Sequence, residues 1–181
     1  MNRRALAAFA AGALAALAFG WTVFPRLLYA TSEQPLRFSH KIHTSDKTGF
    51  GCADCHAIAE DGRFAGIPRL ESCAGCHAEP QGGSGDEKRL VEEYVGPGRE
   101  IEWLVYARQP ENVRFSHAIH VKRAEIACER CHSDHGTSDA LAPHATNRIT
   151  GYSRDLQKMS ECESCHGEHA AGRTACLACH K

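Results

Sequence analysis

Aromatic residues, methionine and net charge are all scarce in this chain of 181 residues. Its 2 Trp, 4 Tyr and 7 Phe predict only a thin ordinary core for a length that suits one domain or two small ones. A formal net charge of −1 excludes the strong positive bias of nucleic-acid binders. The 10 Cys and 12 His are in clear excess, so the chemistry must be sought in these residues.

The N-terminus carries an apolar run, Ala5 to Phe24, that follows Arg3 and Arg4 and is broken at Pro25. A run of about 20 residues is long enough to span a bilayer. The leading arginines would keep the N-terminus in the cytoplasm. The run therefore predicts one N-terminal transmembrane helix in the inner membrane.

A cleaved signal peptide is the alternative interpretation of this segment. Cleavage after Ala30 would place Leu28 at the −3 position, where signal peptidase sites have a small residue. We therefore expect residues 1–30 to remain as an uncleaved signal anchor. Either interpretation exports residues 31–181 to the periplasm.

All ten cysteines fall into five copies of one motif, C-x-x-C-H, and none is left over. The motifs are Cys52–His56, Cys73–His77, Cys128–His132, Cys162–His166 and Cys176–His180, in which the second cysteines are Cys55, Cys76, Cys131, Cys165 and Cys179. C-x-x-C-H is the attachment signal for c-type heme. Two intervening residues let both sulfurs reach the vinyl groups of one porphyrin, and the next residue, His, is carried beneath the ring to bind the iron as proximal ligand. The sequence thus predicts five covalently attached hemes c.

Three other uses of paired cysteines explain the pattern less well. A disulfide framework needs only an even number of cysteines, with no His after each pair. Zinc sites draw a second pair of ligands from further along the chain. A thioredoxin-like redox pair would give one motif, not five.

Seven further histidines are candidates for the opposite, distal side of the irons: His40, His43, His117, His120, His135, His144 and His169. Electron-transfer hemes usually take a sixth ligand, His or Met. Besides Met1, the only methionine is Met159, so at most one heme can be His/Met. Because Met ligation raises the reduction potential, the sequence predicts mostly bis-His hemes of low potential.

Four of these histidines form two similar elements, Phe38-Ser-His40-Lys-Ile-His43 and Phe115-Ser-His117-Ala-Ile-His120. Each is followed, after seven or eight residues, by a C-x-x-C-H motif. The H-x-x-H spacing places both imidazoles on one turn, where they can serve two different hemes. We expect all four to be distal ligands.

The fifth distal ligand is not determined by the spacing. His135 and His169 each lie three residues after a proximal His, and we rank them equally, with His144 third.

The predicted fold is mostly irregular and α-helical, with a transmembrane helix followed by a multiheme c-type cytochrome domain whose core is built by the hemes. Short helical turns are expected at the motifs, as at 70–76 and 125–131. The repeated pattern suggests two sub-modules, about 31–80 and 110–181, joined by a linker at 81–109.

Two stretches lack heme motifs. Residues 86–94 predict an amphipathic helix, and the aromatic residues of 101–106 would pack on a heme or form a docking surface for a partner subunit. Residues 137–158 read as a solvated loop, long enough to suspect a role.

Beyond the heme motifs, the chain resembles the family of membrane-anchored multiheme cytochrome c subunits of the bacterial menaquinone reductase complex, Qrc. The likeness covers most of the chain and includes the anchor and the segments Glu33–His40, Leu90–Tyr94, Trp103–Tyr106, Gln109–His117 and Arg148–Asp155. The F-x-H-x-x-H element is also similar to class III cytochromes c, in which the two histidines bind different hemes. The resemblance implies a complex with an iron–sulfur subunit, a molybdopterin-enzyme-like subunit and a polytopic quinone-binding subunit. It further implies that electrons from periplasmic class III cytochromes c pass through this subunit toward menaquinone.

We therefore expect an electron-transfer subunit with no catalytic residues of its own, not an enzyme by itself. The alternatives are an anchored quinol dehydrogenase that acts alone and a soluble periplasmic multiheme carrier. A multiheme reductase is disfavoured, because it needs an iron with an open coordination position. The seven histidines outside the motifs are enough to supply a sixth ligand to all five irons.

Overall fold

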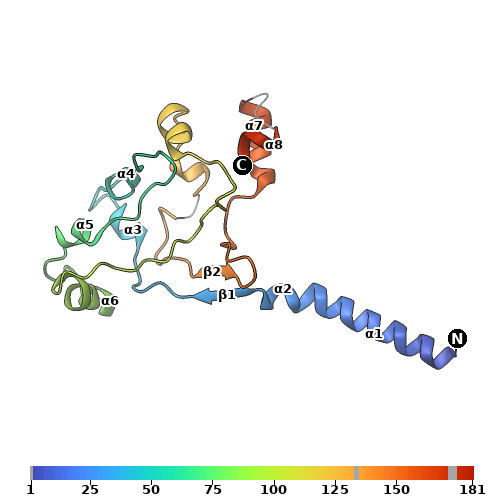
Figure 1. Ribbon diagram of the computed structural model, residues 1–181. Helices are drawn as coiled ribbons and strands as arrows, with labels where there is room; N and C mark the ends of the chain where they lie inside the picture. The colour runs from blue at the N-terminus through green and yellow to red at the C-terminus, as the bar shows by residue number, and fades with distance from the viewer. Residues whose placement is uncertain (1, 133–134, 171–174) are drawn as a thin grey trace.

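In the computed structural model, which describes residues 2–132, 135–170 and 175–181, one long helix projects from a small domain of short helices and loops (Figure 1). This helix, α1 (Arg3–Thr22), has 20 residues rich in the strong helix formers Ala and Leu. Its first turn is capped by the Asn2 side chain, which accepts the Arg4 N–H at 3.2 Å. The short α2 (Phe24–Leu27) follows and has Pro25 in its first turn, where proline is tolerated.

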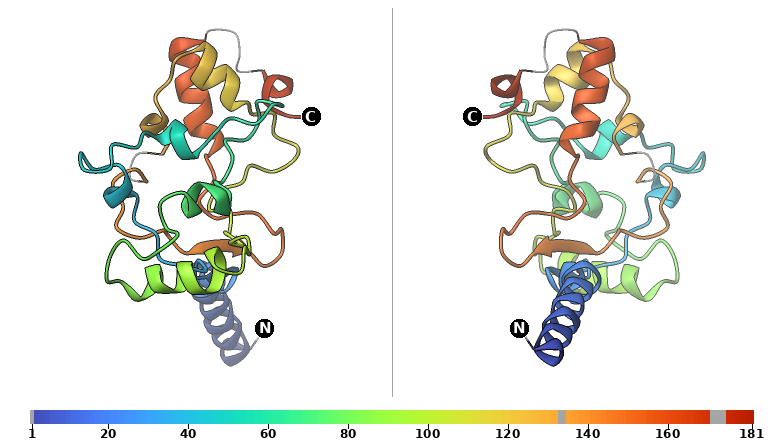
Figure 2. Two further views of the ribbon diagram at one scale, coloured as in Figure 1. Left: turned by 90° about the vertical axis from the view of Figure 1, so that its left-hand side faces the viewer. Right: turned by 90° about the vertical axis from the view of Figure 1, so that its right-hand side faces the viewer.

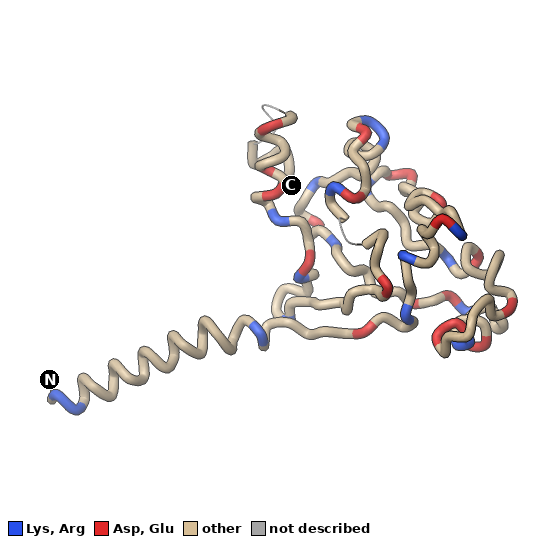
Figure 3. The backbone as a smooth tube through the Cα atoms, turned by 180° about the vertical axis from the view of Figure 1, so that it is seen from behind, with Lys and Arg blue, Asp and Glu red and all other residues tan. Residues whose placement is uncertain are grey.

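Helix α1 makes an apolar rod with no residue buried against the rest of the chain, and the Trp21 side chain is 81% exposed. Its length and composition suit a membrane span, in agreement with the predicted anchor. Figure 3 shows basic residues near both ends of the rod and no acidic residue along it.

A two-stranded antiparallel sheet lies at the base of α1 (Figure 2). Strand β1 (Tyr29–Ser32) pairs with β2 (His144–Asn147), with Tyr29 opposite Asn147 and Ser32 opposite His144. The pairing buries Ala145 almost completely, at 1% exposure. The expectation of a solvated loop over 137–158 is therefore wrong for its centre, because the partner strand lies more than 100 residues away in sequence, where no local pattern signals it.

The remaining elements are single turns or short helices. They are α3 (His40–His43), α4 (Cys52–Cys55), α5 (Leu70–Ala74), α6 (Gly85–Arg89), the π-helical turns η1 (Leu90–Val95) and η2 (Ala118–Arg123), the 3-10 turn η3 (Cys128–Arg130), α7 (Met159–His169) and α8 (Cys176–Cys179). The helix expected at 86–94 is thus divided into an α-helical and a π-helical part. The mostly α-helical and irregular fold class is as predicted.

The apolar core of the described residues is small. Leu36, Leu70, Tyr94 and Ile101 form one buried cluster between α5 and η1, against which Trp103 packs. The non-heme stretch 86–106 therefore supplies much of the cluster. A chain with so little apolar burial of its own fits a domain that gains most of its interior from bound cofactors.

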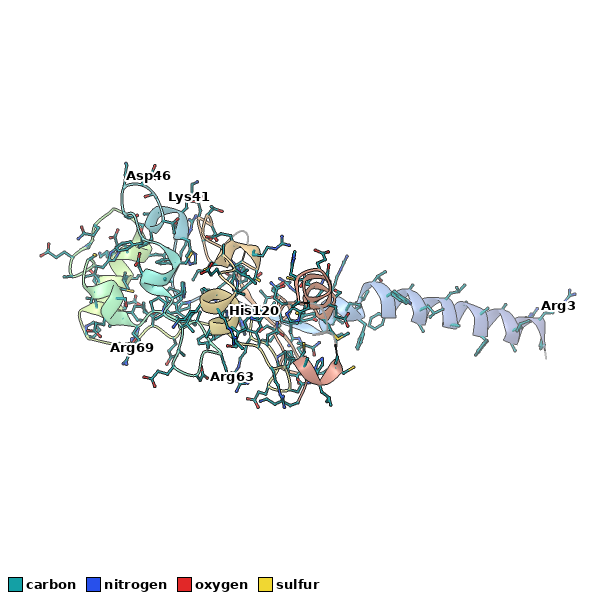
Figure 4. All side chains as sticks on the ribbon, turned by 90° about the horizontal axis from the view of Figure 1, so that it is seen from above. Arg3, Lys41, Asp46, Arg63, Arg69 and His120 are labelled. Atoms are coloured by element: carbon teal, nitrogen blue, oxygen red, sulfur yellow. The ribbon has the colours of Figure 1, made fainter. Side chains whose placement is uncertain are left out.

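The domain has two ends with respect to the anchor. Helices α7 and α8 lie on the side from which α1 leaves, whereas α5 and α6 lie on the opposite side (Figures 1 and 4). In Figure 4, His120 lies between these ends and Arg69 lies at the end remote from Arg3.

Candidate functional site

The C-x-x-C-H motifs share one local backbone geometry. In four of them the His N–H donates to the carbonyl of the first cysteine, at 2.8 Å for His56 and 2.9 Å for His77, His132 and His180. The remaining motif, Cys162–His166, lies inside α7, and α-helical geometry supplies the same four-residue step. Each motif is therefore one turn that carries both thiols and the imidazole together.

None of the ten cysteines is in a disulfide. Burial raises the pKa of Cys55, Cys73 and Cys162. Paired thiols with a His after each pair fit the thioether chemistry of heme attachment.

Four C-x-x-C-H histidines each face one histidine of an F-S-H-x-x-H element. The ring centroids of His40 and His56 are 6.3 Å apart, and those of His43 and His77 are 6.1 Å apart. The second element repeats the arrangement, with His117 and His132 at 6.5 Å and His120 and His166 at 6.0 Å. The two rings of each H-x-x-H therefore face two different motifs.

These separations match two imidazoles on opposite sides of one metal ion. An imidazole nitrogen binds a metal at about 2.0–2.1 Å and lies about 1.1 Å from its ring centroid, so two opposed ligands have centroids about 6.2–6.4 Å apart. Direct stacking would bring the rings closer than this, and the pairs therefore leave the room that one iron and its ligand bonds require.

Each F-S-H-x-x-H element orients its second histidine in the same way. Phe38 stacks on His43 with centroids 4.4 Å apart, and Phe115 stacks on His120 at 4.7 Å. The Nδ1 atoms of His43 and His120 lie 2.8 Å from the carbonyls of residues 39 and 116. A donating Nδ1 directs the free electron pair of Nε2 toward the metal side.

Two of the paired histidines also have electrostatic surroundings that favour the neutral ring. Burial is the main cause of the lowered pKa of His40, and the nearby His56 is the second cause. Burial is also the main cause of the lowered pKa of His132, and His135 is the second cause. A lowered pKa favours the neutral imidazole, the form that binds a metal.

A loop from the first half of the chain holds the second F-S-H-x-x-H element. The Gly62 carbonyl accepts the Ala118 N–H at 2.9 Å, and His117 Nδ1 lies 2.8 Å from the Arg63 carbonyl. Gly62 has φ of +68°, and a Cβ there would lie 2.8 Å from the Ala118 Cβ. Sequence reasoning missed this contact, although an isolated glycine between two motifs is the signal that marks such a close approach.

One C-x-x-C-H histidine contacts a carboxylate. His77 Nδ1 lies 3.1 Å from Glu87 Oε1, and both side chains are largely covered, at 20% and 13% exposure. Sequence reasoning did not single out Glu87.

The candidates for the fifth distal ligand lie in different places. The ring of His135 lies edge-on to Tyr106 at 4.8 Å and is 5.6 Å from the ring of His132, which already faces His117. His169 ends α7, and His144 begins β2, where its Nδ1 is buried without a hydrogen-bond partner. Within the described ranges, no imidazole faces His180 as in the four pairs.

Shared turns place the motifs in a row. The motifs of His56 and His77 face the turn of His40 and His43, and the motifs of His132 and His166 face the turn of His117 and His120. Burial raises the pKa of Cys73, and the nearby Cys55 raises it further. Burial likewise raises the pKa of Cys52, and the nearby Cys128 adds to this effect. Cys52 Sγ also lies 3.7 Å from Glu129 Oε1 within the third motif.

The row continues toward the C-terminus. Burial is the main cause of the raised pKa of Cys131, and the nearby Cys165 is the second. For Cys162, burial is again the main cause and Cys179 the second. Named by their histidines, the motifs therefore follow the order His77, His56, His132, His166 and His180.

Comparisons with known proteins identify the family of the chain. Residues 42–146 match the family model of cytochrome c3, and residues 113–181 match that of cytochrome c7 and related cytochrome c. The chain is 46% identical over 190 residues to the menaquinone reductase, multiheme cytochrome c subunit, of Nitratidesulfovibrio vulgaris strain Hildenborough. That match covers 97% of this chain and 90% of the relative. On these grounds the chain belongs to the cytochrome c family of menaquinone reductase multiheme subunits.

Proposed function

We propose that this chain is a pentaheme electron-transfer subunit of a membrane-bound menaquinone reductase. Four His–His pairs carry the proposal, because each unites a C-x-x-C-H histidine with an F-S-H-x-x-H histidine at a separation of 6.0–6.5 Å. Heme c, when bound, supplies an iron that exchanges one electron without leaving its site. The chain contributes attachment, axial ligands and spacing, and it is not itself the enzyme.

The four pairs define the proposed axial ligand sets. His56, His77, His132 and His166 are proximal ligands, and the distal ligands opposite them are His40, His43, His117 and His120, respectively. Because each H-x-x-H turn is shared between two sites, the turn fixes the two sites relative to each other.

His180 is the proposed proximal ligand of the fifth site. Of the two equally ranked distal candidates, His169 is favoured by its position, because it ends the helix whose Cys162 neighbours Cys179. His135 lies instead beside His132 and His40, two motifs away in the row.

The row runs between the two ends of the domain. The motif of His180 lies on α8, on the side of the anchor, and the motif of His77 lies at α5, on the remote side. We infer that the site of His180 exchanges electrons with partners at the membrane and the site of His77 with soluble periplasmic partners.

The remote end has the charge to receive a basic partner. Residues 69–100 include seven acidic and four basic residues, and both kinds gather there in Figure 3. Heme propionates would add negative charge. Such an end favours association with a cationic partner. We propose that periplasmic class III cytochromes c bind here.

The similarity to a subunit of a menaquinone reductase supports a set of membrane partners. A menaquinone reductase needs a subunit that binds the quinone, and we propose a polytopic quinone-binding subunit together with an iron–sulfur and a molybdopterin-enzyme-like subunit. The anchor would keep the domain on the periplasmic face of the inner membrane.

Mass measurement of the protein purified from membranes tests this function directly. We expect the intact chain, with its N-terminus retained, plus the mass of five hemes. Co-purification of a quinone-binding membrane subunit is expected as well. A chain with free thiols and no porphyrin mass would refute the proposal.

The position of α8 near the anchor also suits a second function, that of an anchored quinol dehydrogenase acting without partner subunits. The two functions differ in what the purified subunit does alone. Reduction of its hemes by a menaquinol analogue, without any partner, would favour the second function. The first predicts reduction only within the complex.

A further inference from the structure

The proximal histidines differ in what their outward nitrogen contacts. His56 directs Nδ1 to the Gly66 carbonyl at 2.8 Å, and the distal His43, His117 and His120 likewise face backbone carbonyls at 2.8 Å. His77 faces the Glu87 carboxylate at 3.1 Å. A carboxylate is a stronger hydrogen-bond acceptor than a carbonyl, because it carries a full negative charge.

Glu87 is held in this position by its own backbone and by its neighbours. It is the third residue of α6, and its N–H donates to the hydroxyl oxygen of Ser84, which caps the helix, at 3.1 Å. A glutamate at this position usually reaches back to the N-terminal capping residue. Here its Oε1 instead accepts the Gln81 N–H at 2.5 Å and faces His77.

The chain leaves room for this carboxylate. A Cβ at Gly82 would lie 2.8 Å from Glu87 Oε2, so glycine permits the close approach of the loop to the carboxylate. The contact is also shielded from water, since the Glu87 side chain is 13% exposed and that of His77 is 20% exposed. Shielding strengthens an interaction between a charge and a polar group.

We propose that Glu87 is a positioning residue that lowers the reduction potential of the heme held by Cys73, Cys76 and His77. The inference rests on the proposed function. By attracting the Nδ1 proton, the carboxylate makes Nε2 a stronger electron donor, and this stabilises the oxidised iron. The negative charge of the carboxylate acts in the same direction by Coulomb attraction.

This site lies at the remote end of the row, so the proposal has a consequence for electron transfer. A strongly reducing potential at that end opposes the return of an electron from the interior of the row. Electrons delivered there by a low-potential partner would therefore pass on toward the anchor.

The Glu87→Gln variant tests the inference, because glutamine keeps the size and the acceptor oxygen but removes the charge. Glu92→Gln is the matched control: it removes one charge from the same helical stretch, where the Glu92 side chain is 62% exposed and pairs with Lys88 at 3.7 Å. Both variants would be purified from membranes and their hemes counted by mass. Their potentials would then be measured by titration with optical and electron paramagnetic resonance detection.

We expect one of the five potentials to rise in Glu87→Gln. Loss of an outer-shell partner of a metal ligand typically changes metal affinity or activity by about tenfold or more. A tenfold change in the ratio of oxidised to reduced heme corresponds to about 59 mV for one electron. The low-spin resonance of the same heme should shift its g-values. Glu92→Gln should leave all five potentials in place.

Three results would overturn the inference. They are unchanged potentials in Glu87→Gln, an equal rise in Glu92→Gln, and loss of one heme from Glu87→Gln, which would show that Glu87 serves attachment and not tuning. A wild-type protein that lacks five heme masses would instead contradict the proposed function itself.

Discussion

Alanine at Gly62 should damage the second F-S-H-x-x-H element without touching any heme ligand. Gly62 has φ of +68°, a region that costs a residue with a Cβ about 1–2 kcal/mol. The new Cβ would also lie 2.8 Å from the Ala118 Cβ, well inside van der Waals contact. Overpacking of this kind adds about 1–3 kcal/mol.

Gly49→Ala separates the two contributions. Gly49 has φ of +71°, and a Cβ there meets nothing within 4 Å, so this variant carries the backbone cost alone. The difference in unfolding free energy between the two variants should therefore be about 1–3 kcal/mol. For a chain of this length, a loss of 1 kcal/mol lowers Tm by about 2–4 °C.

The assay is thermal unfolding of the heme-loaded protein, followed by circular dichroism and heme absorbance. A second measurement records the electron paramagnetic resonance of the heme assigned to His117 and His132. Gly62→Ala must move the His117 Nδ1 contact with Arg63, at 2.8 Å, so this one signal should change. Equal Tm values for the two variants, with all signals unchanged, would refute the close approach of this loop to the element.

Three further changes have distinct expected outcomes. His120→Ala removes the ring whose centroid lies 6.0 Å from that of His166 and should convert one heme from a low-spin to a high-spin signal; a fully low-spin spectrum would contradict the pairing. Hydrogen bonds from the Leu70 N–H and, less strongly, from Arg69 lower the pKa of Glu100. The ionised Glu100 therefore stabilises the fold above the ordinary glutamate pKa, and this stabilisation is lost as pH falls through the lowered pKa. Glu100→Gln should therefore flatten the loss of stability in this acid range, as measured by Tm against pH, and an unaltered acid slope would count against the contact. Removal of residues 1–28, with an exported leader in their place, should release a heme-loaded domain from membranes, and its retention in the membrane fraction without partner subunits would argue against α1 as the anchor.

Local patterns of the sequence were sufficient for much of this protein. The five C-x-x-C-H motifs, the apolar helix and the two F-S-H-x-x-H elements were identified without tertiary structure. The reason is physical: attachment involves two sulfurs and one imidazole within five consecutive residues, and a membrane span depends on one uninterrupted apolar run. The small core was likewise expected, because the few aromatic residues predict only a thin ordinary core and so a mostly irregular and helical fold.

Only the tertiary structure decided the relations between distant segments. It paired β1 with β2, determined which motif each histidine of an H-x-x-H turn faces, brought Glu87 to His77 and arranged the motifs in a row that does not follow chain order. The spacing of His40 and His43 shows that they share a turn, but the direction in which each ring points depends on loops that close far away in the sequence. These closures depend on the path of the whole chain, and no local pattern specifies that path.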